Sequence, residues 1–74
     1  MLNLEISEIF KEIAKILDIK GDNVFRIRAY ERAAQNMENL SEDISQLIQE
    51  DRLTDLPGIG KDLSEKIKEI YKTR

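Results

Sequence analysis

The chain has 74 residues and a net charge of −3, from 12 basic and 15 acidic side chains, with neither cysteine nor histidine. This length allows one domain at most, and this composition excludes disulfides, the usual zinc ligand sets and histidine-activated nucleophiles. No apolar run approaches the roughly 20 residues that cross a membrane and no signal peptide is visible, so we expect a cytoplasmic protein without membrane contacts.

Two helical patterns fill the first half of the chain. Apolar residues recur every three or four positions over residues 4–17, which predicts a helix that buries Ile6, Ile9, Phe10, Ile13, Ile16 and Leu17. Gly21 suits the end of that helix, and Asp22 or Asn23 can cap the next one. A second helix is predicted over residues 24–39, with a stripe made of Ile27, Tyr30, Ala33, Ala34 and Met37.

The second half predicts two more helices. Ser41 is the expected N-cap of a short third helix, and Asp51 and Arg52 break the pattern after it. A last helix is predicted from Lys61 to about Lys72. No stretch alternates with the period of a strand, so we predict an all-α, compact four-helix domain. Its expected core is Ile9, Ile13, Ile16, Ile27, Tyr30, Met37, Leu47, Leu56, Leu63, Ile67 and Ile70.

The most informative stretch lies between the last two helices. Pro57 suits the first corner of a tight turn, and Gly58 and Gly60 permit positive φ and the close approach of another backbone. The run Leu56-Pro57-Gly58-Ile59-Gly60 resembles the hairpin of a helix-hairpin-helix motif over about residues 53–72. The N–H groups that start the last helix can bind a phosphate oxygen without any side-chain charge. The alternative is a helical corner that binds nothing.

A second motif resembles a known family. Residues 25–30, Phe-Arg-Ile-Arg-Ala-Tyr, followed by Arg32-Ala33-Ala34, are similar to the signature of the amino-terminal 8-kDa domain of family X DNA polymerases, which are polymerase beta-like. Residues 20–23 fit the bacterial and archaeal branch, and residues 59–67 fit the family's hairpin. The resemblance covers nearly the whole chain. It implies that residues 1–74 are one domain excised from a longer chain, with a stand-alone homologue as the alternative.

The resemblance implies a function in base excision repair, in which this domain grips the 5′-phosphate side of gapped or nicked DNA. Arg26 and Tyr30 match positions on that side of the gap, and Phe25 matches one where a ring can stack on a base. For Phe25 the alternative is core packing; for Arg28 and Arg32 it is a solvated face paired with acids such as Glu31 and Glu38. The expected DNA-binding set is Phe25, Arg26, Arg28, Tyr30, Arg32, Gly58, Ile59, Gly60, Lys61 and Lys66.

The resemblance also implies a cation site at the hairpin. The backbone carbonyls of Thr54, Leu56 and Ile59 are expected to coordinate a monovalent cation, K⁺ or Na⁺, that links the turn to a DNA phosphate. The alternative is that water hydrates these carbonyls. No other cofactor is expected in this domain.

Lys66 matches the Schiff-base lysine of family members that act as 5′-deoxyribose-phosphate lyases. Asp62 lies one turn earlier, where an ion pair would keep the Lys66 amine charged. Lyase-active members carry basic residues at the positions of Asp62 and Thr54, so both departures are expected to weaken phosphate binding and to leave Lys66 less activated. Three hypotheses follow: a DNA-binding module of a repair polymerase, a lyase, or an interdomain module that docks through its acidic first helix. We expect a monomer whose further partner is the polymerase domain of the parent chain.

Overall fold

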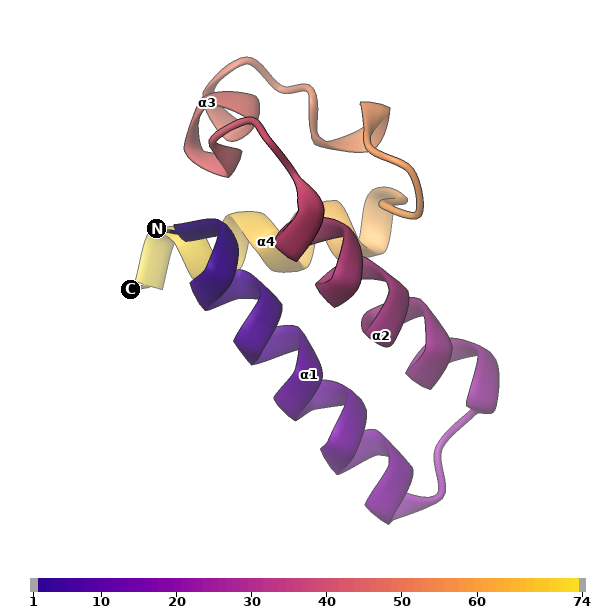
Figure 1. Cartoon of the computed structure of the whole chain (residues 1–74). Coiled ribbons are helices and arrows are strands. Elements are labelled where there is room, and N and C mark those ends of the chain that lie inside the picture. Colours follow the sequence, from indigo (N-terminus) through magenta and orange to yellow (C-terminus); the bar gives the residue numbers. More distant parts are fainter. Residues whose placement is uncertain (1, 74) are drawn as a thin grey trace.

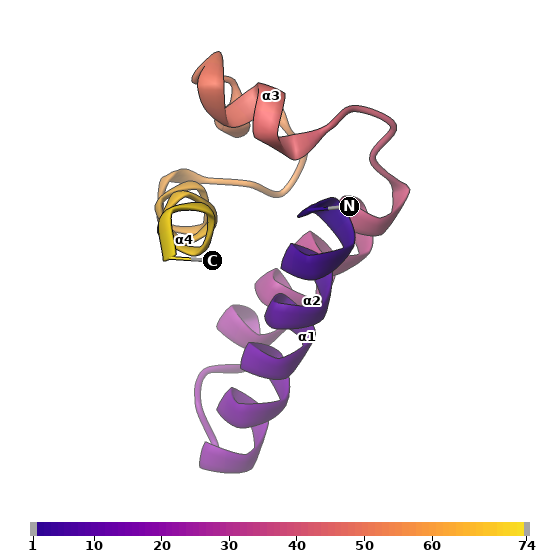
Figure 2. The ribbon, with the colours of Figure 1, turned by 90° about the vertical axis from the view of Figure 1, so that its left-hand side faces the viewer.

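The computed structural model describes residues 2–73. The elements in chain order are α1 (Leu2–Lys20), α2 (Val24–Asn39), α3 (Ile44–Gln49), the 3-10 turn η1 (Leu53–Asp55) and α4 (Lys61–Thr73). These residues contain no strand, so the predicted all-α, four-helix fold is confirmed. Figure 1 shows α1 and α2 as an antiparallel pair, with α4 crossing behind it and α3 at the end near the N-terminus. Figure 2, in which α4 is seen end-on, places α4 to one side of this pair.

One contiguous core joins all these elements. From α1 it takes residues spaced by three or four positions, which places them on one face. The Phe10 ring meets Tyr30 of α2 edge-on, with ring centroids 5.3 Å apart and planes at 87°, a favourable geometry for an aromatic pair. Ala33 and Ala34 of α2 are fully buried, and their small side chains suit the close approach of α1. The buried apolar residues of α1 are Leu2, Ile6, Phe10, Ala14 and Leu17.

The predicted phase of the first helix was partly wrong. Ile9 and Ile16 were expected in the core but are 37% and 52% exposed. The reason is that the apolar stripe of α1 is wider than the face it packs against α2, so its outer edge stays in solvent. Ile13, Leu56 and Ile70 are only partly buried against the core. The other predicted core residues, Ile27, Tyr30, Met37, Leu47, Leu63 and Ile67, are buried. The helix also extends past the predicted range at both ends.

The helix caps show two confirmed predictions and one wrong one. Gly21 follows the end of α1 with φ +74°, as a capping glycine does. Asn23 caps α2, its side chain accepting the N–H of Phe25 at 2.7 Å. Ser41 does not cap α3. Asp43 does, because it immediately precedes the helix and its side chain accepts the N–H of Ser45 at 2.9 Å. No helix among residues 2–73 is long and apolar enough to span a membrane.

A buried asparagine, which the sequence pattern did not single out, ties α3 to the start of α1. Asn3 is 2% exposed. Its side chain donates to the Glu42 carbonyl at 2.7 Å and accepts the Ile44 N–H at 2.8 Å. Both polar ends of the buried amide are therefore satisfied, and the turn before α3 is held against α1. This contact fixes the segment that leads into the hairpin.

Candidate nucleic-acid interface

The hairpin between η1 and α4 is a tight turn anchored on both sides. Leu53 and Ile59 are 1% and 3% exposed, so each flank is fastened in the core. Between them Pro57 and Gly58 are exposed. The Ile59 N–H donates to the Leu56 carbonyl at 3.2 Å, and Gly58 has φ +78°. Proline and then a left-handed glycine at the two corners define a type II turn. Gly60 does not have positive φ, so the conformational freedom allowed for it is not used.

This turn leaves several backbone donors without partners inside the protein. Within residues 2–73 the N–H groups of Gly58 and Gly60 donate to no protein acceptor. The first hydrogen bond that closes α4 runs from the Ser64 N–H to the Gly60 carbonyl at 2.9 Å. The N–H groups of the preceding residues in the first turn of α4 therefore have no intrahelical acceptor. Together with the positive end of the helix dipole, they can bind an anion such as a phosphate oxygen.

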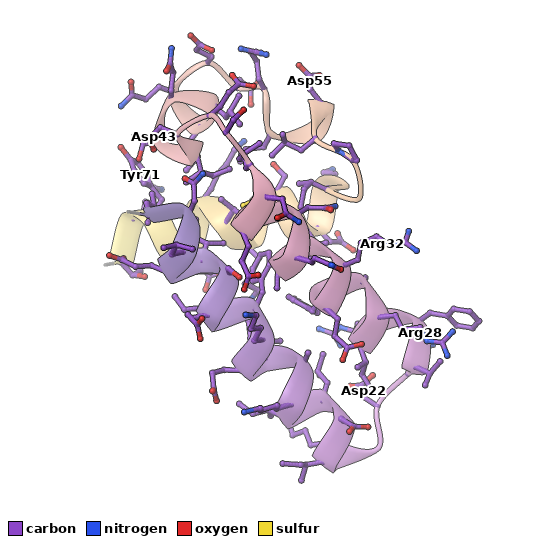
Figure 3. The ribbon with its side chains drawn as sticks, in the orientation of Figure 1. Asp22, Arg28, Arg32, Asp43, Asp55 and Tyr71 are labelled. Atoms are coloured by element: carbon purple, nitrogen blue, oxygen red, sulfur yellow. The ribbon has the colours of Figure 1, made fainter. Side chains whose placement is uncertain are left out.

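A groove that contains two arginines lies between α2 and the hairpin. It has a volume of about 370 Å³ and is lined by Phe25, Arg28, Ala29, Arg32 and Gly58. Arg28 and Arg32 are exposed, and neither forms an ion pair with any described residue. Figure 3 shows both side chains projecting from the same side of α2, away from α1. A Cβ built on Gly58 would lie 3.4 Å from Cδ of Arg32, so the arginine stem packs against the turn.

Phe25, for which core packing was the alternative, lies at the surface. Phe25 is 77% exposed, so it does not pack in the core. An exposed ring beside two arginines can offer a face to a nucleobase. Glu38, one of the acids suggested as a partner for the arginines, instead accepts hydrogen bonds from Lys11 and Ser7 on α1. The Lys11 hydrogen bond is the main cause of the lowered pKa of Glu38, and it raises the pKa of Lys11.

A second depression, called here the α2–α4 cleft, lies on the neighbouring face of α2, and Ala29 lines both depressions. Its volume is also about 370 Å³. It brings together Arg26, Tyr30 and Lys66, three residues predicted to contact DNA, with a lining completed by Ala29, Asp62, Leu63, Glu65 and Glu69. Two cationic side chains thus face three carboxylates. Tyr30 contributes little surface, because it is 6% exposed and its ring belongs to the core.

Both cations of the α2–α4 cleft have acidic partners. Arg26 lies 3.7 Å from a carboxylate oxygen of Asp22, and Lys66 Nζ lies 3.6 Å from one of Glu69. The Lys66 partner is thus Glu69 rather than Asp62, which also lines the cleft. The Lys66 side chain is 39% exposed. A phosphate that enters this cleft must compete with carboxylates, whereas a phosphate in the groove meets none in its lining.

The remaining predicted site residues lie around the hairpin. Lys61 is exposed at the first position of α4, and Thr54 is exposed within η1. The Leu56 carbonyl, one of the three expected cation ligands, already accepts the Ile59 N–H in the turn. A carbonyl oxygen has a second lone pair, so coordination of a monovalent cation remains a prediction. No group of three histidine, cysteine, aspartate or glutamate side chains within residues 2–73 is placed to hold a metal ion.

One residue at the hairpin was not anticipated from the sequence. The Asn36 side chain, on α2, donates from Nδ2 to the Pro57 carbonyl at 2.8 Å. A polar residue in a helix usually hydrogen-bonds nearby or faces water, whereas this bond joins residues 21 positions apart. No local sequence signal could have found it.

Comparison with known proteins gives one result that covers the whole chain. The model of a family described as a helix-hairpin-helix domain matches residues 1–74. No curated protein matches the chain significantly. The hairpin in the description of this family corresponds to the turn between η1 and α4 in this chain.

Proposed function

The chain belongs to the helix-hairpin-helix domain family, and on this premise we propose that it binds the DNA backbone without sequence preference. Membership of the family indicates nucleic-acid binding in general. The observation that carries the more specific proposal is one continuous surface: the unpartnered N–H groups at Gly58 and Gly60 adjoin a groove with two arginines and no carboxylate in its lining. This surface suits a polyanion, even though the whole protein is acidic.

The groups on this surface determine the kind of binding. Amide and arginine contacts to phosphate fix position and orientation but carry no sequence information. Arg28 and Arg32 can each grip phosphate oxygens with a planar fork. Two or three neutralised phosphates give a slope on the order of −2 to −3 when log affinity is plotted against log salt concentration. Modest affinity and a shallow salt dependence are therefore expected.

The test is fluorescence anisotropy with two unrelated duplexes of equal length, measured at several salt concentrations. Equal affinities and a shallow slope support the proposal. A slope near roughly −8 would reveal a much larger basic surface than the groove supplies. No binding at low salt would exclude the function and leave the interdomain module as the better hypothesis.

The finer proposal is that the chain is the 8-kDa domain of a family X repair polymerase, gripping the 5′-phosphate of gapped or nicked DNA beside the polymerase domain of its parent chain. The support is the resemblance of residues 25–34 together with the shared location of Arg26 and Lys66 in the α2–α4 cleft. The carboxylates of the cleft limit the expected preference for a 5′-phosphate over a 5′-hydroxyl to about tenfold or less. Arg26→Ala should abolish most of that preference, and equal affinities in the wild type would argue against the 5′-phosphate site.

A lyase is the second candidate, and one observation favours it: the Lys66 amine borders a cleft large enough for an opened sugar phosphate. The amine would attack the C1′ aldehyde, lose water and form a Schiff base. Borohydride trapping tests this: reduction of the Schiff base formed on a 5′-deoxyribose-phosphate nick leaves a stable covalent adduct, and wild type is compared with Lys66→Ala. An adduct that persists in the alanine variant excludes Lys66 as the main nucleophile. No adduct in either protein leaves a binding module.

A further inference from the structure

The hydrogen bond between Asn36 and the hairpin has a consequence for the donor that the hairpin presents. The peptide bond between Pro57 and Gly58 is trans, so its carbonyl and its N–H point in opposite directions. Asn36 Nδ2 holds that carbonyl toward α2 at 2.8 Å. The Gly58 N–H therefore points away from α2, and it donates to no acceptor within residues 2–73.

We propose that Asn36 is a positioning residue for DNA binding, which rests on the proposed function: it fixes the orientation of the Pro57–Gly58 peptide and so aims the Gly58 N–H at a backbone phosphate. A type I and a type II turn differ mainly by a flip of this central peptide. The hydrogen bond from Asn36 stabilises the orientation seen here. Without it, the flipped form would turn the carbonyl outward, where it would repel a phosphate.

A second contact couples the same residue to Gly58. A Cβ at Gly58 would lie 3.2 Å from Asn36 Nδ2, which is closer than an ordinary contact. The Asn36 amide therefore covers the α-carbon of Gly58 while it holds the neighbouring carbonyl. On this geometry α2 supplies both the charged part of the interface, through Arg28 and Arg32, and the residue that orients the uncharged part.

The variants separate positioning from folding. Asn36→Leu removes the donor at nearly constant size. Asn36→Gln keeps an amide donor, and the shallow groove of about 210 Å³ that Asn36 lines beside Leu40 and Pro57 has room for one more methylene. Gln35→Leu makes the same amide-to-apolar change at the adjacent exposed residue of α2 and serves as the matched control.

Two measurements are made. Fluorescence anisotropy gives the affinity for duplex DNA at several salt concentrations, and NMR gives the chemical shifts of the backbone amides with and without DNA. Asn36→Leu should bind about three- to tenfold more weakly, the effect of one neutral hydrogen bond. Its salt slope should be unchanged, because no cation is removed, and the DNA-induced shift of the Gly58 amide should shrink. Asn36→Gln should recover most of the affinity, and Gln35→Leu should behave as wild type.

The outcomes distinguish this inference from the proposed function. If wild type binds DNA and Asn36→Leu binds equally well, Asn36 has no positioning role but the function stands. If wild type does not bind, both are excluded. Should Asn36→Leu fail to fold, the wild-type spectrum still decides: a Gly58 amide that does not shift at DNA saturation overturns the inference.

Discussion

The groove and the α2–α4 cleft lie on neighbouring faces of the same helix, have similar volumes and each contain two cationic side chains, yet they differ in their acidic residues. Arg28 and Arg32 in the groove have no ion-pair partner among residues 2–73. In the cleft, Arg26 and Lys66 pair with Asp22 and Glu69. Arg26 and Arg28 lie only two positions apart in the sequence, yet only Arg28 is free to bind a phosphate, because Arg26 has a carboxylate partner.

This difference explains how an acidic chain can present a site for a polyanion. The net charge of −3 is an average over the whole sequence. The structure places acids against the cleft and, through the pair of Glu38 with Lys11, on the side of α2 that faces α1. Exposed ion pairs of this kind add little to stability. Their larger effect here is on which arginines remain free to meet a phosphate.

The strongest test removes the cationic side chains of the groove and, in a separate variant, those of the α2–α4 cleft. Arg28→Ala combined with Arg32→Ala should weaken duplex binding about ten- to hundredfold at low salt, because two charge-assisted contacts, each weakened by exposure to solvent, are lost. The salt slope should become shallower by about 1.8, or 0.9 for each phosphate no longer neutralised. Anisotropy across a salt series measures both quantities.

The matched control is Arg26→Ala combined with Lys66→Ala. It removes the same number of charges from the α2–α4 cleft and should weaken binding to intact duplex much less. If this control loses as much affinity as the groove variant, the proposed difference between the groove and the cleft is wrong. In that case the carboxylates of the cleft do not restrict its cations, and total positive charge governs binding.

The two hairpin glycines give the next largest effect. A Cβ at Gly60 meets no atom within 4 Å and the residue lacks positive φ, so Gly60→Ala should fold normally. It should still bind DNA about three- to tenfold more weakly, because the methyl group hinders the approach of a phosphate to the free N–H groups. Gly58→Ala should lose stability instead, by about 1–2 kcal/mol from its left-handed backbone alone.

Thermal unfolding separates the two glycine variants, since about 1 kcal/mol shifts the melting temperature of a domain this size by roughly 4–8 °C. Gly60→Ala with normal melting and normal affinity would mean that phosphate does not approach the hairpin at this residue. Gly58→Ala with an unchanged melting temperature would contradict the positive φ at Gly58.

A smaller effect is expected when one acid of the α2–α4 cleft is neutralised. Glu69→Gln removes the partner of Lys66 and should raise the preference for a 5′-phosphorylated gap about two- to threefold, as expected for one partly exposed charge. Glu12→Gln, the same change at an exposed position of α1, is the control and should leave the preference unchanged. Competition between gaps with 5′-phosphate and 5′-hydroxyl ends measures it. No change in Glu69→Gln would indicate that the cleft does not receive the phosphate.

Local patterns predicted most of the fold and one part of the site. The helical spacing of apolar residues gave the four helices, and the Pro57-Gly58 pair gave the tight turn, because both are properties of short segments. Ile9 and Ile16 were misplaced because the apolar stripe of α1 is wider than the face that packs against α2, and spacing does not show which edge of a stripe is covered. The contact between Asn36 and Pro57 and the pairing of Lys66 with Glu69 rather than Asp62 depend on side-chain positions in the folded chain. Spacing alone does not determine them.

The smallest expected effect is the acid sensitivity of the fold, which bounds the pH range in which the groove and the α2–α4 cleft can be compared. The hydrogen bond from Lys11 lowers the pKa of Glu38, so this carboxylate stabilises the fold above its unfolded pKa of about 4.3. That contribution is lost as pH falls through the lowered pKa. The raised pKa of Lys11 acts at the other extreme, where its contribution is lost only as pH rises through that value. Between these limits the contribution of the Lys11–Glu38 pair to stability does not change with pH.

The melting temperature should therefore fall below about pH 4 in wild type and less steeply in Glu38→Gln, relative to their own values at neutral pH. Equal acid dependence in the two proteins would show that the Lys11–Glu38 pair adds nothing to stability, and that other carboxylates set the limit.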